Sequence, residues 1–247
     1  MKLIICGYNG RMGRAVAAAA VAAGHTVAAG IDAAEDATAA VPVYAQTAGL
    51  PHADAVVDFS RPAALPMLLD YAVHTKTPLV LATTGYSEGD TAAIAAAAKK
   101  VPIFFSRNMS VGIALLRALC ERAATVLGAG FDVEIIEKHH NQKQDAPSGT
   151  ALMLAEAVNE GRETPLTAVY GRGGNDCKRK PDELGIHAVR GGNIVGEHDV
   201  LFIGAEETVT LSHTANSRSV FALGAVRAAA FIAQKRNGLY DMKDLVK

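Results

Sequence analysis

Short apolar runs alternate with longer amphipathic segments along the first part of the chain. Five runs have the length and the β-branched content of buried strands, and they span residues 2–6, 25–32, 53–60, 77–85 and 101–110. Three segments between them have the apolar spacing of helices, and they span residues 14–24, 61–75 and 87–100. Pro62 lies where the first turn of the second helix is expected. Strands that alternate with helices predict an α/β fold with a parallel, doubly wound sheet.

The pattern changes after residue 110. Helices are predicted over residues 111–130 and 145–161, with a strand-like segment over 131–140 between them. Four further strand-like runs follow, with turn residues but no room for crossover helices, at residues 166–171, 184–190, 193–204 and 206–215. They indicate an antiparallel or mixed sheet with one open face. The apolar segment 219–242 predicts a helix that returns to the first domain.

Composition narrows the class of protein. The 247 residues allow one large or two modest domains, and 50% of them are hydrophobic, as in proteins with a substantial core. The net charge of −1 gives no indication of nucleic acid or an anionic membrane as a partner. No apolar run reaches the ~20 residues that span a bilayer. Three widely spaced cysteines form no CxxC pair, which favours a reducing cytoplasm.

The segment 170–185 is rich in glycine and basic in its middle. It has two interpretations, a solvated surface loop or a flap over a charged substrate. Nucleic-acid binding by its Lys-Arg-Lys run is disfavoured, because no stacking aromatic residues or wider basic face accompany the run.

A glycine-rich turn follows the first predicted strand. Gly7, Gly10 and Gly13 are spaced G-x-x-G-x-x-G, a modest departure from the G-x-G-x-x-G of dinucleotide-binding folds. Asp32 closes the next strand 19 residues after Gly13, where such folds place the acid that binds ribose. Strand, glycine turn, helix, strand and acid occur in order, which predicts a nucleotide cofactor. The alternative is a merely structural turn.

Polar or glycine-rich tips follow each predicted strand of the first domain. They are Gly7–Gly13, Asp32, Phe59-Ser60, Thr83–Gly85 and Ser106–Met109. Ligands of doubly wound sheets bind beyond the carboxyl ends of the strands, so these tips are expected around one crevice. Any single tip could be ordinary turn chemistry.

The stretch "EKHHNQKQDAPSGT", residues 137–150, carries the densest candidate chemistry. Adjacent His139 and His140 on a strand would point to opposite faces, which disfavours a shared metal ion. His139 and Lys143 are candidates for proton transfer. Residues 147–150 stand where a helix begins, so their N–H groups and hydroxyls could bind an anion. The alternative is a polar strand-to-helix loop with a capping hydroxyl.

This stretch resembles the signature of the 4-hydroxy-tetrahydrodipicolinate (dihydrodipicolinate) reductase family of lysine biosynthesis. The resemblance covers essentially the whole chain, because further motifs stand in the family's order: "GYNGRMG", "DFSRP", "ATTGYS", "NMSVGI", "VRGGNIVGEH" and "SHTANSRSVFALGAVRAA". It implies a Rossmann-type domain of residues 1–108 and 217–247, with an inserted α+β substrate and oligomerisation domain of residues 109–216.

The resemblance also implies roles for individual residues. His139 and Lys143 match the catalytic positions, and the substrate-binding positions are His140, Ser148, Gly149 and Thr150. The cofactor contacts it implies are Gly7, Tyr8, Asn9, Gly10, Arg11, Met12, Asp32, Ala82, Thr83, Thr84, Ser106, Arg107, Asn108 and Met109. The implied activity is hydride transfer from NAD(P)H to a small dicarboxylate, by a homotetramer.

Four residues bear on the choice of cofactor. Asp32 would repel the 2′-phosphate of NADPH, and Ala33-Ala34 follow it where many members carry Arg or Lys. We therefore expect NADH to be preferred, with Arg11 allowing some use of NADPH. The alternatives to this activity are a different Rossmann reductase, such as an amino-acid dehydrogenase, or an inactive cofactor-binding paralogue.

Overall fold

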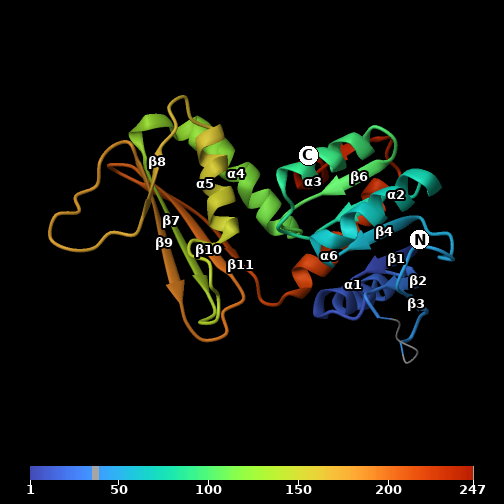
Figure 1. Cartoon of the computed structure of the whole chain (residues 1–247). Coiled ribbons are helices and arrows are strands. Elements are labelled where there is room, and N and C mark those ends of the chain that lie inside the picture. Colours follow the sequence, from blue (N-terminus) through green and yellow to red (C-terminus); the bar gives the residue numbers. More distant parts are fainter. Residues whose placement is uncertain (35–38, 247) are drawn as a thin grey trace. The chain divides into compact units, whose positions relative to one another are not determined.

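The computed structural model describes residues 1–34 and 39–246 (Figure 1). The chain forms two compact units, and each is described by itself. The first unit comprises Met1–Val111 and Ser219–Lys247, and the second unit comprises Gly112–Arg218. The second unit is therefore inserted between two segments of the first.

The described part of the first unit contains a seven-stranded, wholly parallel sheet. Its strands are β1 (Lys2–Cys6), β2 (Thr26–Ile31), β3 (Val43–Tyr44), β4 (Ala55–Asp58), β5 (Leu79–Leu81), β6 (Pro102–Phe105) and β12 (Gly238–Tyr240). The spatial order is β12-β6-β5-β4-β1-β2-β3, so the direction of winding reverses between β1 and β4. This is the doubly wound, Rossmann-type arrangement, and the predicted fold class is confirmed.

Helices cover both faces of this sheet (Figure 1). They are α1 (Arg11–Ala22), α2 (Leu65–Thr75), α3 (Glu88–Ala98), α6 (Ser219–Ile232) and the short α7 (Met242–Leu245), with a 3-10 turn, η1 (Pro62–Ala64), before α2. α1 packs beside α6, and α2 beside α3. Ser87 and Asp90 form a capping box at the start of α3, which satisfies two N–H groups reciprocally.

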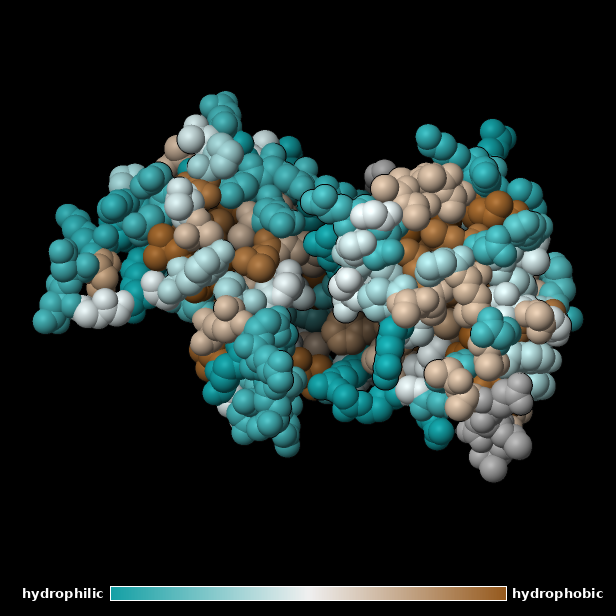
Figure 2. Space-filling model, viewed as in Figure 1, coloured by the Kyte–Doolittle hydropathy of each residue, from teal (hydrophilic) through white to brown (hydrophobic). Residues whose placement is uncertain are grey.

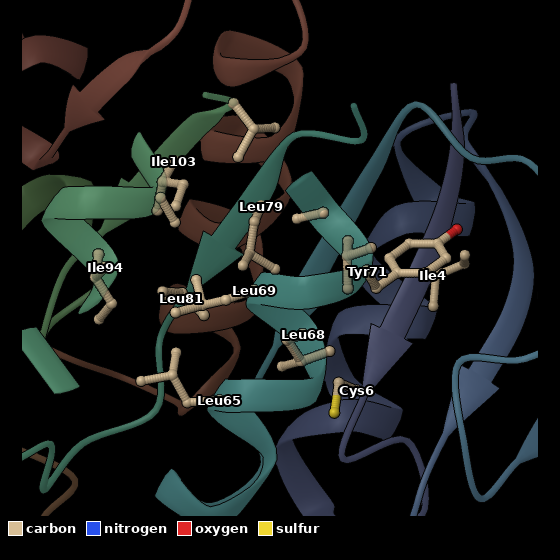
Figure 3. Close-up of a cluster of buried hydrophobic side chains, with 14 of the residues drawn as sticks. Ile4, Cys6, Leu65, Leu68, Leu69, Tyr71, Leu79, Leu81, Ile94 and Ile103 are labelled. Atoms are coloured by element: carbon tan, nitrogen blue, oxygen red, sulfur yellow. The ribbon is translucent and has the colours of Figure 1, made fainter. Parts of the chain in front are cut away.

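The core on the α2–α3 side is continuous (Figure 3). Its labelled members come from α2, α3, β1, β5 and β6: Leu65, Leu68, Leu69, Tyr71, Ile94, Ile4, Cys6, Leu79, Leu81 and Ile103. Leu3 and Ile5 alternate with Ile4 along β1 and are equally buried, each at 0% exposure. Both faces of the strand are therefore covered, which explains its unbroken apolar run.

The carboxyl-terminal helix is shorter than its sequence pattern predicts. We expected a helix over residues 219–242, but α6 ends at Ile232 and Gly238–Tyr240 form β12, which pairs with β6. The polar residues after Ile232 lead to Asn237 and Gly238, both poor helix formers. The exposed edge of β6 then recruits the following residues as a parallel strand. The two-residue β3 was not predicted, because it is too short to show a period.

The second unit contains a five-stranded mixed sheet and two long helices. The strands are β7 (Asp132–His139), β8 (Thr167–Tyr170), β9 (Glu183–Arg190), β10 (Glu197–Ile203) and β11 (Thr208–Thr214), in the order β11-β10-β7-β9-β8. β7, β9 and β8 run parallel, whereas β10 is antiparallel to both β7 and β11. The helices are α4 (Val111–Leu127) and α5 (Gly149–Glu160), and the 3-10 turn η2 (Gly128–Gly130) follows α4.

The core of the second unit lies between this sheet and the helices α4 and α5. Val133 and Ile135 of β7 are fully buried there, whereas Glu134 and Ile136 point to the other face and are half-buried. The strand predicted over residues 131–140 is therefore confirmed as β7, and its side chains alternate between the two faces of the sheet. Figure 2 shows hydrophilic residues spread over the visible surface, with hydrophobic patches between them. Within the described residues, no helix is both long and apolar enough to cross a bilayer.

Candidate active site

The glycine turn between β1 and α1 is closely packed. Gly7 has a φ of +79°, and a Cβ there would lie 2.7 Å from the carbonyl oxygen of Phe59. A Cβ on Gly13 would overlap the carbonyl oxygen of Gly7. Gly7 thus permits the tight turn, and Gly13 permits the close approach of α1 to that turn.

The start of α1 fits a phosphate group. Gly10 is the N-cap and makes no side-chain capping hydrogen bond, so the first N–H groups of the helix, from Arg11 and Met12 onward, have no capping side chain. Such groups and the positive end of the helix dipole bind anions. The turn of Gly7, Tyr8, Asn9 and Gly10 lies at the switch point between β1 and β4.

Asp32 lies beside this turn. Its Oδ2 accepts a hydrogen bond from the backbone N–H of Asn9 at 2.8 Å, and its Oδ1 accepts one from the N–H of Ala33 at 2.8 Å. The carboxylate is half-buried and keeps further acceptor capacity on both oxygens. The structure therefore brings the predicted acid and the predicted glycine turn together, in an arrangement that fits an adenosine ribose.

Asp58 organises the next two strand tips, a role that the sequence analysis did not assign to it. It is fully buried and accepts hydrogen bonds from Ser60 Oγ at 2.5 Å, Thr83 Oγ1 at 2.7 Å and Tyr86 OH at 3.2 Å. Burial and then the charge of Asp58 raise the pKa of Tyr86, which keeps its hydroxyl a donor. The same two causes raise the pKa of Cys6 to about 12.

A pocket of about 290 Å³ opens beside these tips. Its lining contains residues of the predicted strand tips, Thr83, Thr84, Gly85 and Arg107. It also contains Tyr86 and Phe105, which were not predicted. Ala82 is buried just before it. Ser106 Oγ donates to the carbonyl of Asn108 at 2.7 Å, and Met109 is buried where Gly224 of α6 packs against its backbone.

In the second unit, β7 places Glu137 and His139 on the same face, because side chains alternate along a strand. Glu137 is 0% exposed and His139 is 8% exposed. His139 Nδ1 lies 2.6 Å from Glu137 Oε2. His140 follows the strand and is half-buried. The two adjacent histidines therefore differ in surroundings.

Two groups from outside β7 hold Glu137 in place. Arg190 binds it through two hydrogen bonds of 2.7 and 2.8 Å, and the backbone N–H of Ser148 donates to its Oε1 at 2.9 Å. Burial raises the pKa of Glu137, but the hydrogen bonds from Arg190, His139 and Ser148 outweigh it, so the pKa lies below its ordinary value. Glu137 is therefore an ionised, buried acceptor.

The pKa of His139 is also lowered, for a different reason. Burial disfavours its charged form most, and the charges of Lys143 and Arg190 act in the same direction. The hydrogen bond and the charge of Glu137 oppose them. The proton affinity of His139 therefore results from a balance between burial and one carboxylate.

Ser148 caps α5 and forms the start of the predicted anion site. Its Oγ accepts from the N–H of Ala151 at 3.2 Å and lies 3.2 Å from His198 Nε2. Gly149 is exposed, and a Cβ there would meet no other described atom within 4 Å, so open space lies in front of it. Thr150 is in the first turn of the helix. These three residues form one helix start.

Lys143 lies in the loop between β7 and α5. Its Nζ donates to Asp145 Oδ1 at 2.8 Å, and Arg190 Nη2 donates to the carbonyl of Asp145 at 2.7 Å. The backbone N–H of Lys143 donates to the carbonyl of His140 at 3.2 Å. Lys143, His140 and the helix start therefore belong to one ordered loop around Glu137.

Two contributors to this site, Arg190 and His198, were not predicted as site residues, although both lie in the motif "VRGGNIVGEH". Arg190 arrives because β9 pairs in parallel with β7, which aligns it with His139. His198 arrives on β10, where its ring lies edge-on to that of His139 with a centroid separation of 5.2 Å. Glu137 was not predicted either, although it stands two residues before His139 on a strand and so shares its face.

The arrangement combines a buried histidine–carboxylate pair with a nearby lysine and an open helix start. It suits proton transfer to an anionic ligand. Among the described residues, no group of three or more His, Cys, Asp or Glu side chains is arranged to hold a metal ion.

Comparison with known proteins identifies the family. The family model "Dihydrodipicolinate reductase, N-terminus" matches residues 1–109, and "Dihydrodipicolinate reductase, C-terminus" matches residues 112–246. The 4-hydroxy-tetrahydrodipicolinate reductase of Caldanaerobacter subterraneus is 50% identical, covering 100% of this chain and 98% of its own. That of Clostridium novyi is 45% identical, with coverage of 100% and 98%.

A solved structure supports the fold. The dipicolinate-bound dihydrodipicolinate reductase from Paenisporosarcina sp. TG-14 matches with a TM-score of 0.82 and 24% identity, over 99% of this chain and 98% of that one. The fold, two complete family models and relatives of up to 50% identity agree. The chain therefore belongs to the dihydrodipicolinate reductase family, the NAD(P)H-dependent oxidoreductases of diaminopimelate and lysine biosynthesis.

Proposed function

We propose that this protein reduces 4-hydroxy-tetrahydrodipicolinate to tetrahydrodipicolinate, with the first unit binding the reduced nicotinamide and the second unit binding the substrate. The observation that carries the assignment of roles is the His139–Glu137 pair beside the helix start at Ser148. In a chain of this family, the His139–Glu137 pair offers a proton-transfer group, and the helix start offers an anion-binding site.

The first unit would hold the cofactor by its strand tips. The uncapped start of α1 suits the pyrophosphate and Asp32 suits the adenosine ribose, while Thr83, Thr84 and Arg107 line a pocket that suits the nicotinamide. When bound, the cofactor supplies the hydride. We propose a preference for NADH, because the carboxylate of Asp32 would repel a 2′-phosphate. Arg11, exposed in the first turn of α1, could still allow NADPH to bind.

The second unit would hold the substrate and deliver the proton. Ser148, Gly149 and Thr150 would bind one carboxylate at the start of α5, and His140 would help to orient the ring. The reaction adds a hydride from the cofactor and a proton to the substrate, and its 4-hydroxyl group leaves as water. A proton donor close to the ring lowers the barrier. His139 and Lys143 are the two candidates for that donor.

The decisive experiment is a coupled assay. Substrate is generated from pyruvate and aspartate semialdehyde, and the absorbance of NADH and NADPH is followed in separate reactions. We expect oxidation of both cofactors, with a higher kcat/KM for NADH. No oxidation above background would overturn the proposed activity, as would equal turnover of amino-acid substrates in a control panel. A clear preference for NADPH would overturn only the role of Asp32.

A second measurement addresses assembly. Tyr170 of β8 and Val189 of β9 are large apolar side chains left 65% and 45% exposed on the second unit. Burial of such side chains against other copies of the chain would support the homotetramer expected from the family resemblance. Light scattering during size-exclusion chromatography should give four times the 25.7 kDa chain mass. A monomeric mass would contradict this expectation. The cytoplasmic location stays a prediction.

A further inference from the structure

We infer that Glu137 is a positioning residue that fixes which nitrogen of His139 exchanges a proton and couples that nitrogen to the substrate-binding helix start. This inference rests on the proposed role of His139. It concerns a residue that does not itself touch the substrate.

The protonation of Glu137 follows from its partners. The guanidinium of Arg190 and the backbone N–H of Ser148 are donors in every protonation state, and both donate to this carboxylate. Its pKa lies below the ordinary value although its side chain is 0% exposed. Glu137 is therefore ionised and offers only acceptors at neutral pH.

The ionised Glu137 then determines the tautomer of His139. Its Nδ1 lies 2.6 Å from an oxygen that can only accept, so Nδ1 must carry a hydrogen. Nε2 is the remaining nitrogen, and it is the atom that gains or loses the exchangeable proton. Gly196 lies against Nε2, where a Cβ would come to 3.1 Å, so a glycine keeps this side of the ring uncrowded.

Glu137 also sets how readily Nε2 holds its proton. Burial lowers the pKa of His139, and the carboxylate is the main group that opposes this effect. Without the negative charge, the imidazolium would lose its proton at lower pH. A group that must donate a proton near neutral pH depends on this compensation.

The same carboxylate joins two parts of the site. Oε2 faces His139 Nδ1, whereas Oε1 accepts from the N–H of Ser148 at the N-cap of α5. A shift of Glu137 would therefore move the proton donor and the helix start together. Loss of Glu137 should consequently raise KM and lower kcat, rather than affect one alone.

The opposite face of β7 provides a matched control. Glu134 Oε2 lies 2.7 Å from His187 Nε2, and Arg172 and Arg179 also donate to Glu134. This second carboxylate–histidine–arginine cluster has the same chemistry on the same strand, yet it lies away from the helix start. Removal of the Glu134 carboxylate tests whether loss of any hydrogen-bonded carboxylate on β7 gives the same effects.

The experiment compares Glu137→Gln, Glu137→Asp and Glu134→Gln in the full-length protein. The kcat and KM are measured against pH, and the ring nitrogens of His139 are followed by NMR after selective ¹⁵N-histidine labelling, with His139→Gln identifying the signal. In the wild type, we expect an Nδ1–H form that titrates at Nε2. A neutral form with hydrogen on Nε2 would overturn the inference even if no variant folds.

Glu137→Gln should lower kcat by roughly tenfold to a hundredfold, the scale on which loss of a carboxylate that orients a metal-bound histidine acts. The pH above which kcat falls should move to a lower value, and KM should rise. In Glu137→Asp, this pH should lie between the values of Glu137→Gln and the wild type. In Glu134→Gln, it should equal the wild-type value. The inference would be overturned if this pH did not change in Glu137→Gln, or if it changed equally in Glu134→Gln. An inactive wild type would instead refute the proposed function.

Discussion

Arg190 binds both carboxylate oxygens of Glu137, at 2.7 and 2.8 Å, across the parallel pair β7 and β9. Glu137 has no exposed side-chain surface, so Arg190 supplies most of the charge that permits its burial. The pair is therefore expected to matter for stability as well as for the site.

Arg190→Met should lower the free energy of unfolding by about 3 kcal/mol, because it leaves a buried carboxylate without its cation. Urea unfolding at pH 7, followed by circular dichroism, measures this loss. Arg117→Met is the control: Arg117 binds Glu160, which is 43% exposed and stays hydrated when its partner is removed, so the expected loss is about 1 kcal/mol or less. Equal losses in the two variants would contradict the argument.

Lys143→Ala should lower kcat by roughly a hundredfold or more, the usual scale for loss of a general acid. Stability should change little, because the partner in its ion pair, Asp145, is 58% exposed. Steady-state assays and thermal unfolding separate the two effects. Lys138→Ala removes a lysine from the opposite face of β7 and should keep near-normal turnover. Wild-type kcat in Lys143→Ala would remove this lysine from the mechanism.

His198 should make the protein less stable in mild acid. Burial and the neighbouring His139 lower its pKa from 6.5 to about 4. The unfolded chain therefore binds a proton below pH 6.5 that the folded chain refuses, so stability falls as the pH drops from 6.5 toward 4. The full effect is about 3 kcal/mol.

Urea unfolding at pH 7 and at pH 5 tests this dependence. The loss between the two pH values should be smaller in His198→Gln than in the wild type, because the variant has no group to titrate at this position. If both proteins lose the same stability, His198 is not the group responsible.

Gly13→Ala should weaken cofactor binding and destabilise the first unit, because its Cβ would overlap the Gly7 carbonyl and push α1 away from the turn. Titration of NADH fluorescence and thermal unfolding measure the two effects. Gly89→Ala is the control, since its Cβ inside α3 would meet its nearest atom, Ser87 Oγ, at 3.7 Å. That variant should be neutral or stabilised by up to about 1 kcal/mol. Normal NADH affinity in Gly13→Ala would refute the packing argument.

Local sequence patterns predicted much of the fold. The strand-like pattern of residues 131–140 predicted the strand β7, and the order of Gly7, Gly13 and Asp32 predicted the turn beside β1. The helix predicted over 219–242 is present as α6 but ends at Ile232, because residues 238–240 pair with β6 instead. Local periodicity cannot report that competition, since the partner strand lies far away in the sequence.

In the candidate site too, residues close together in the sequence were predicted, whereas residues brought in by the sheet were not. His139, Lys143 and Ser148 stand close together in one stretch, so their types and spacing indicated chemistry directly. Arg190 lies 53 positions beyond Glu137, and His198 lies 50 positions beyond Ser148. Both reach the site only through the order and register of the sheet. A single sequence does not specify that register.

The insertion of the second unit has a consequence for synthesis on the ribosome. Gly112–Arg218 emerge as one continuous segment and carry all the strands of their own sheet. The first unit lacks α6 and the edge strand β12 until that segment has passed. The first unit is therefore the first to begin translation and the last to complete its core. Until then, the apolar surface that α6 later covers and the unpaired edge of β6 are exposed. Both could associate with other chains and cause aggregation during synthesis.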